Sequence, residues 1–185
     1  MDKDKQAVKT VLFYSGLLII CLICVVYLHH LLHPLPQMEN SYTVQEPILH
    51  GLYDVVRTVD GDTIVINLDG AETTIRLIGV DTPESVHPDA SRNTDEGKIA
   101  SEWLADLLAD QQVYIEYDED HTDDYGRTLA YVWLDDGCTM VEEELLRAGY
   151  ASVLTIRPND RYAVRFSRLE TEAKENTRGF WNTDK

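Results

Sequence analysis

The alternation of hydrophobic and polar residues between positions 53 and 80 is typical of β-strands. YDVVRTV, DTIVINL and ETTIRLIGV are β-branched runs separated by Asp60-Gly61 and Asp69-Gly70. Aspartate–glycine pairs between such runs favour tight hairpin turns. The pattern therefore predicts three consecutive strands that form a meander.

A helical period follows over residues 95–110, where the apolar residues recur every three or four positions. They are Ile99, Ala100, Trp103, Leu104, Leu107 and Leu108. Two further β-rich runs, QVYIEY and TLAYVWL, are joined by the polar loop 118–127.

Two short helices are predicted after the last of these strands. Thr139 and Glu142 have the spacing of a capping box, and Gly149 is placed to end the helix that they begin. Asn159 or Asp160 would then cap a final helix. Its apolar face carries Tyr162, Phe166 and Leu169.

The element order βββ-α-ββ-α-α predicts an α+β fold. Five short antiparallel strands with a helix between the third and fourth fit a five-stranded OB-fold β-barrel with three helices. We place this domain at residues 51–182, with a short tail at 183–185. OB barrels bind oligonucleotides and oligosaccharides, but the fold alone does not assign a function.

An apolar run of 18 residues precedes the domain, at 11–28, and no Lys, Arg, Asp or Glu occurs between Lys9 and Glu39. A helix of this length rises about 27 Å, close to the thickness of a bilayer core. A buried helix would be expected to show a polar face. A cleaved signal peptide would need a small-residue cleavage site, which YLHHLLHPLP does not offer. We therefore expect one uncleaved transmembrane helix at residues 11–32, in contact with the lipid bilayer.

The positive charges near this segment predict its orientation. Lys3, Lys5 and Lys9 precede the anchor, and the next basic residue after it is Arg57. The positive-inside bias predicts a short cytoplasmic N-terminus at residues 1–10. Residues 33–50 would form a linker, and the folded domain would lie outside the cell membrane. Cys138 is the only cysteine beyond the anchor, so no disulfide is expected within this domain.

The domain is strongly acidic. Residues 1–50 carry a net charge of −1, which leaves −16 of the total −17 on residues 51–185. Such a field opposes long-range attraction of nucleic acid. An acidic surface either keeps an exported protein soluble or suits a salt-rich habitat that screens the field.

Carboxylates gather where the predicted strands end. Asp60 and Asp62 flank Gly61 at the first turn, and Asp81 and Glu84 close the third strand. Singly, each acid is most simply a turn former. In a meander, however, the start of the second strand and the end of the third share one rim. Two carboxylates there, with free carbonyl oxygens, suit Ca²⁺ or Mg²⁺.

Two arginines extend this arrangement toward phosphate chemistry. Pro83 restricts Thr82 to an extended backbone that aims its carbonyl oxygen, and the turn allows Arg76 to approach Glu84. Gly126 permits a tight loop that can present Arg127. Arginines with a metal site and a carboxylate suit a phosphodiester, although each arginine could instead form a solvated ion pair.

Three motifs in order, VDGDT (59–63), RLIGVDTPE (76–84) and DDYGRTLAYVW (123–133), resemble the staphylococcal nuclease (thermonuclease) family. The resemblance is collinear from about residue 53 to residue 181. It implies a Ca²⁺-dependent phosphodiesterase that cuts DNA and RNA and leaves 3′-phosphates.

The resemblance also implies roles for the acidic rim. Asp62 and Asp81 match the calcium carboxylates of the family, and Thr82 matches a ligand that uses its backbone carbonyl. Glu84 matches the residue that positions or activates the attacking water. Asp60 matches an acid that stands behind these ligands.

The substrate-facing positions show both agreement and departure. Arg76 and Arg127 match the pair that clamps the scissile phosphate, and Tyr125 matches a tyrosine that contacts a substrate phosphate. Where the best-known member has two tyrosines flanking the base, this chain has Leu154 and Ile156. Loss of base stacking removes about 1–3 kcal/mol per base.

Asp124 stands beside Tyr125 where that member has a lysine. We expect an active monomeric enzyme with DNA and RNA as substrates, a high KM and no protein partner. The alternative is a non-catalytic OB module that binds nucleic acid or protein. Such a module would not need Glu84 together with both arginines.

Overall fold

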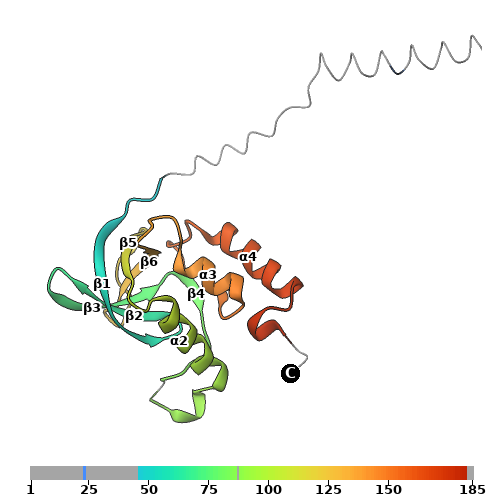
Figure 1. Cartoon of the computed structure of the whole chain (residues 1–185), viewed down its shortest axis with the longest axis horizontal. Helices are drawn as coiled ribbons and strands as arrows, with labels where there is room; N and C mark the ends of the chain where they lie inside the picture. Colours follow the sequence, from blue (N-terminus) through green and yellow to red (C-terminus); the bar gives the residue numbers. More distant parts are fainter. Residues whose placement is uncertain (1–22, 24–45, 87, 183–185) are drawn as a thin grey trace, which may run out of the picture. The chain divides into compact units, whose positions relative to one another are not determined.

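The computed structural model describes Ile23, residues 46–86 and residues 88–182. Within residues 46–182 five strands close into a barrel in the order β1-β2-β3-β6-β5. Their bounds are β1 (His50–Asp60), β2 (Thr63–Leu68), β3 (Ala71–Leu77), β5 (Gln112–Glu116) and β6 (Thr128–Leu134). Figure 1 shows the barrel with the helices packed beside it. The predicted five-stranded barrel is confirmed.

The first three strands form the expected meander. Thr63 of β2 pairs with Arg76 of β3, and the ladder continues to Leu68 opposite Ala71. The β2–β3 hairpin turns at Asp69 and Gly70, whose φ values are 53° and 93°. Both lie in the left-handed region that this tight turn requires.

The expectation that all neighbouring strands of the barrel are antiparallel is wrong for one pair. β3 and β6 are parallel, with Leu77 opposite Ala130. The other pairs in the ring are antiparallel. Because five strands cannot alternate in direction around a closed ring, one neighbouring pair must be parallel. The crossover that contains α2 makes this parallel pair possible.

The third predicted strand is broken in two. After β3 the chain bends, and β4 (Gly79–Asp81) pairs with β7 (Ser152–Leu154) as a separate two-stranded sheet. Gly79 has φ 83°, and the Phe166 ring lies 2.6 Å from where a Cβ would stand. The bend carries Asp81 away from the barrel ladder.

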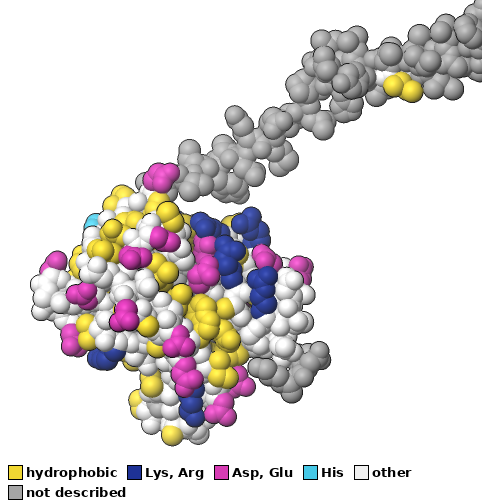
Figure 2. Space-filling model, in the orientation of Figure 1, with side chains coloured by type: hydrophobic (Ala, Val, Ile, Leu, Met, Phe, Trp, Pro, Cys, Tyr) yellow, Lys and Arg dark blue, Asp and Glu magenta, His cyan; other side chains and the backbone are white. Residues whose placement is uncertain are grey.

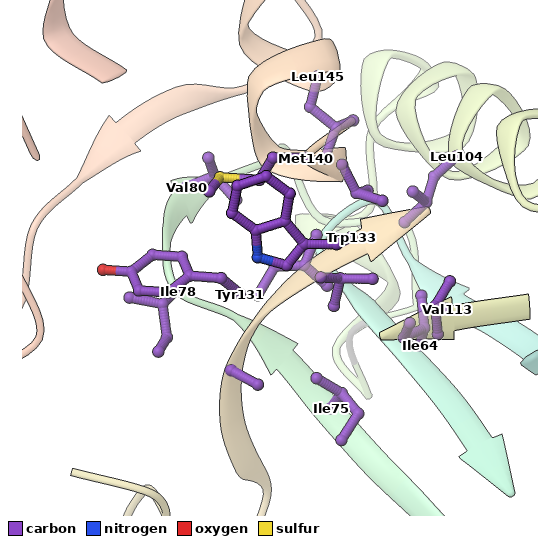
Figure 3. Close-up of a cluster of buried hydrophobic side chains, with 14 of the residues drawn as sticks. Ile64, Ile75, Ile78, Val80, Leu104, Val113, Tyr131, Trp133, Met140 and Leu145 are labelled. Atoms are coloured by element: carbon purple, nitrogen blue, oxygen red, sulfur yellow. The ribbon is translucent and has the colours of Figure 1, made fainter. Parts of the chain in front are cut away.

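Three α-helices complete the fold, as predicted: α2 (Asp95–Leu107), α3 (Val141–Ala148) and α4 (Ala163–Glu175). Short 3₁₀ turns lie at Ala90–Arg92 and Gly179–Trp181. Barrel strands, α2, α3 and α4 contribute to one apolar core, part of which is drawn in Figure 3. Phe166 and Leu169 of α4 are buried as expected, whereas Ile99 of α2 is 43% exposed.

The predicted helix caps differ from those observed. α3 begins after Met140 without a side-chain cap, and Thr139 bonds Asp136. Glu142 is fully buried, and its carboxylate accepts the backbone N–H of Val132 at 3.1 Å. A buried N–H without a partner is costly, so this bond takes precedence over an exposed cap. Gly149 ends α3 with φ 77°, as predicted.

The last helix is likewise not capped as predicted. Tyr162 occupies the N-cap position of α4 and makes no side-chain capping bond. The Asn159 side chain accepts from the Asp120 N–H and donates to the Asp120 carbonyl, both at 2.8 Å. Asn159 therefore fixes the loop before β6 to the segment before α4.

No helix in the described part of the chain is long and apolar enough to span a membrane. The predicted cytoplasmic segment 1–10 and tail 183–185 lie outside the described residues. So does the predicted anchor 11–32, except for Ile23, and most of the predicted linker 33–50.

Candidate active site

Two of the predicted carboxylates converge on one guanidinium. Arg76 Nη2 lies 3.0 Å from Asp62 Oδ2 and 3.3 Å from Asp81 Oδ1. Asp62 lies in the β1–β2 turn, while Asp81 ends β4. Antiparallel pairing of β2 with β3 and the bend after Leu77 bring these distant residues to one rim, as the sequence predicts.

Arg76 is held on its other side by the bend. Its Nη1 donates to the carbonyl oxygens of Leu77 at 2.7 Å and Val80 at 2.9 Å. Only 12% of its side chain is exposed. The guanidinium is therefore fixed before any substrate arrives, which reduces the reorganisation that binding an anion would require.

Burial controls the charge of Asp62. Desolvation raises the pKa of this carboxyl above its ordinary value, although the Arg76 charge and hydrogen bonds from Thr82 and Thr63 act in the opposite direction. Asp81, by contrast, has half of its side chain exposed. The rim thus pairs an enclosed carboxylate with a solvent-facing one.

Thr82 and Asp60 lie directly behind these two acids. The Thr82 N–H donates to Asp62 Oδ2 at 3.2 Å, and its hydroxyl oxygen is buried without a hydrogen-bond partner. Asp60 Oδ1 accepts from the Ser85 hydroxyl at 2.6 Å and from the Gly61 N–H at 2.8 Å. Asp60 therefore ties the first turn to the residue that follows Glu84.

Glu84 is positioned through its backbone. Its carbonyl oxygen accepts the Thr94 N–H at 2.9 Å, where α2 begins. A Cβ on Gly97 would lie 2.2 Å from that same oxygen, so α2 meets the chain as closely as a glycine allows. Among the described residues the half-buried Glu84 side chain has no hydrogen-bond or ion-pair partner. It is available to bind water or a cation.

Arg127 lies on the neighbouring loop rather than on the acidic rim. Its Nε donates to Asp123 Oδ2 at 2.7 Å, and Asp123 Oδ1 accepts the backbone N–H groups of Arg127 and Tyr125. Burial favours a higher pKa for the Asp123 carboxyl, but these hydrogen bonds outweigh it and hold the pKa below its ordinary range. The exposed Tyr125 ring stands 5.5 Å from the Arg127 guanidinium.

A cavity of about 380 Å³ joins the two arginines. Arg76, Arg127, Tyr125, Leu154 and Ile156 are among the residues that line it. Three acids, Asp120, Asp123 and Asp124, also contribute to its wall. The arginines can bind an anionic group in the cavity, and the three acids oppose that binding.

The residues present fit an oxygen-bound divalent cation. The Asp62 and Asp81 carboxylates lie at the rim beside the Thr82 backbone, and carboxylate and carbonyl oxygens are hard ligands of the kind that Ca²⁺ and Mg²⁺ accept. In the described ranges no cluster of three or more Asp, Glu, His or Cys is placed to hold a metal. Backbone carbonyls or water would have to complete the coordination.

The structure therefore brings Asp62, Asp81, Thr82 and Arg76 into contact, with Asp60 behind them. Arg127 and Tyr125 line the neighbouring cavity, where Arg127 binds Asp123 rather than Asp62 or Asp81 among the described residues. Asp123 and Ser85 are the positioning residues that the sequence analysis missed. The role of Asp123 could have been predicted from the sequence, because Asp123 and Arg127 have opposite charges and are four positions apart.

Comparison with known proteins finds a matching family and several similar nucleases. Residues 74–183 match the model of the family described as staphylococcal nuclease homologue. The chain is 42% identical over 130 residues to a thermonuclease of Staphylococcus hyicus, covering 70% of this chain and 75% of that protein. A thermonuclease of Staphylococcus intermedius is 43% identical over 129 residues, with the same coverage. Endonuclease YncB of Bacillus subtilis is 37% identical over 128 residues, covering 68% of this chain and 59% of that protein.

Proposed function

The chain belongs to the staphylococcal nuclease homologue family, and from that membership we propose that it is a calcium-dependent nuclease. It would hydrolyse phosphodiester bonds of DNA and RNA to 3′-phosphate products. The observation that carries this proposal is the convergence of Asp62 and Asp81 on the fixed guanidinium of Arg76, beside a cavity that also holds Arg127.

Arg76 and Arg127 would bind the phosphodiester from two sides. Arg76 is already bound to two carbonyls and two carboxylates, and its place at the cavity wall allows it to stabilise the charge that develops on phosphoryl oxygens. Arg127 is half-buried and is oriented by Asp123. It would stabilise the oxygen that leaves.

Glu84 would accept a proton from the attacking water or orient that water. Its carboxylate has no competing partner in the described part of the chain, and its backbone is fixed by α2. A carboxylate needs such freedom from ion pairs to serve as a base. A calcium ion held by Asp62, Asp81 and the Thr82 carbonyl would supply the positive charge that polarises the phosphate.

We also propose that the domain is displayed outside the cell membrane as a monomer. The support is in the sequence, where the apolar run 11–28 follows three lysines. Protease added to intact cells that express the full chain should remove the domain and leave the N-terminus protected. Protection of the domain would reject this location.

One assay tests the enzymatic proposal. The full chain in detergent is incubated with DNA or RNA and either Ca²⁺ or EGTA, beside Glu84→Gln and Arg127→Ala. We expect cleavage only with Ca²⁺, with kcat reduced about 100-fold or more in each variant. Equal cleavage by the wild type and both variants would reject the assignment. Binding of DNA without any cleavage would favour the OB binding module instead.

A further inference from the structure

Arginines are unevenly distributed in this acidic chain. Four of them, Arg157, Arg161, Arg165 and Arg168, fall within twelve residues whose only acid is Asp160. Figure 2 shows Lys and Arg side chains gathered over α4 and the segment that leads into it. The net charge of the whole chain is −17, so this local excess of cations requires an explanation.

The arginines form a continuous row. Arg157 lines the active-site cavity, and Arg161 follows it by four residues. Arg161 lies in the turn before α4, and Arg165 and Arg168 lie on the helix, four and seven residues further along the chain. Arg165 and Arg168, three residues apart, share one helical face, and seven residues at helical rise advance by about 10 Å. The row therefore begins at the cavity and leads away from it.

The carboxylates that hold this row face inward. Arg161 binds Glu116 and Asp118, whose side chains are at most 5% exposed. Arg165 binds Glu143, which is equally buried. The side chains of Arg161 and Arg165 remain 32% and 43% exposed. Both arginines therefore reach the surface, although each is paired with a carboxylate in the interior.

The two remaining arginines are bound more loosely. The Arg157 side chain is 87% exposed and lies 3.8 Å from Asp160, a surface pair that contributes little energy. Arg168 is exposed and has no hydrogen-bond or ion-pair partner among the described residues. Both guanidinium groups are free to bind an anion with several N–H donors.

We propose that these four arginines form a phosphate-binding track that holds the nucleic acid strand beyond the cleavage site. The inference rests on the proposed nuclease function and adds a substrate preference, for strands longer than the cavity can hold. A strand of DNA carries one phosphate per 3.4 Å of helix axis, so a row of about 10 Å can meet roughly three. Charges beyond about 8 Å are screened at physiological salt, so this local row can bind a polyanion despite the acidic remainder.

The track also compensates for the acidic cavity wall. Asp120, Asp123 and Asp124 disfavour a nucleotide phosphate near Tyr125. A short substrate meets only that wall and the arginines that line the cavity, Arg76, Arg127 and Arg157, whereas a long one also gains contacts along α4. Length dependence is therefore the property that separates the track from the active site.

The test compares two fluorescent oligodeoxythymidines, a trinucleotide and a 20-mer. Binding is measured by anisotropy at 50 and 200 mM salt with the full chain in detergent, on the Glu84→Gln background that prevents cleavage. Arg168→Glu should weaken 20-mer binding about fivefold, as expected for one lost exposed ion pair of about 1 kcal/mol. It should reduce the salt slope by about 0.7 and leave the trinucleotide unaffected.

Lys174→Glu is the matched control. It makes the same charge change on α4, six residues from Arg168 and half a turn round from Arg165. It should leave 20-mer affinity within twofold of the parent. Equal effects of both variants, or equal loss for trinucleotide and 20-mer, would overturn the track.

Cleavage by the otherwise wild-type chain separates this proposal from the nuclease assignment. If the chain cuts DNA but Arg168→Glu leaves the KM of the 20-mer unchanged, only the track fails. If the chain does not cut DNA, the nuclease assignment fails, while the anisotropy comparison still reports on the track.

Discussion

Gly97→Ala tests how closely α2 must approach the backbone of Pro83 and Glu84. Gly97 lies in the first turn of α2, and its N–H donates to the Thr94 hydroxyl at 2.9 Å. A methyl group there would stand 2.2 Å from the Glu84 carbonyl oxygen and 2.6 Å from that of Pro83. Both neighbours are backbone atoms, so no side-chain rotation relieves the clash.

Two opposing effects decide the outcome. Alanine stabilises a helix interior by about 1 kcal/mol relative to glycine. Overpacking costs about 1–3 kcal/mol, and here the contact must lengthen by about 1 Å to reach the normal range. We therefore expect a net loss of stability of up to about 2 kcal/mol. A displacement of about 1 Å at Glu84 should reduce kcat about 100-fold.

The assay measures kcat, KM and the urea midpoint together. We expect the fall in kcat to exceed any change in KM, because the proposed role of Glu84 is in the chemical step and not in substrate capture. Ser101→Ala on the same helix is the control, and it should leave kcat unchanged. A Gly97→Ala variant that is more stable than the wild type and fully active would refute this account of how Glu84 is positioned.

Three further predictions follow from the site and its supports. Arg76→Lys keeps the charge, but a lysine cannot bind two carbonyls and two carboxylates at once. We therefore expect kcat to fall about 100-fold while the circular dichroism spectrum stays native. An unchanged kcat would contradict the proposal that the fixed Arg76 guanidinium stabilises the transition state. Burial raises the pKa of Glu142 well above its ordinary value, so the neutral form stabilises the fold below pH 4.5 and that stability is lost as pH rises through the folded-state pKa. As pH rises from 4.5 toward the folded-state pKa, the free energy of unfolding of Glu142→Gln should therefore increase relative to that of the wild type, by up to about 1.4 kcal/mol per pH unit. A difference in urea midpoint between the two proteins that does not change with pH would be evidence against this prediction. Asp124→Lys should lower KM several-fold at 50 mM salt but not at 1 M, where charges beyond about 3 Å are screened; an effect that persists in high salt would not be electrostatic.

The sequence by itself determined the five barrel strands and one shared rim. Alternating β-branched residues and two Asp-Gly turns predict the meander, and antiparallel pairing then places Asp62 beside the end of β3 that carries Arg76. The prediction succeeds because this information is local. Hairpin geometry relates residues only a few positions apart, so turn chemistry and strand period are sufficient.

Only the tertiary structure decided which partner each polar side chain takes. Glu142 has the spacing of a cap but bonds Val132, and Asn159 bonds Asp120 rather than the first turn of α4. These partners come together only when distant segments pack. Burial then makes an unpaired backbone N–H more costly than an open helix end, and a local motif cannot report that cost.

The approach of Gly97 to Glu84 and the row of arginines along and before α4 also depend on packing. The sequence shows the spacing of the arginines, but only packing pairs Arg161 and Arg165 with buried acids and leaves Arg157 exposed at the cavity. The sequence thus determined the chemical groups of the site. The closed barrel and its helices decided which groups are fixed, which are neutralised and which remain free for substrate.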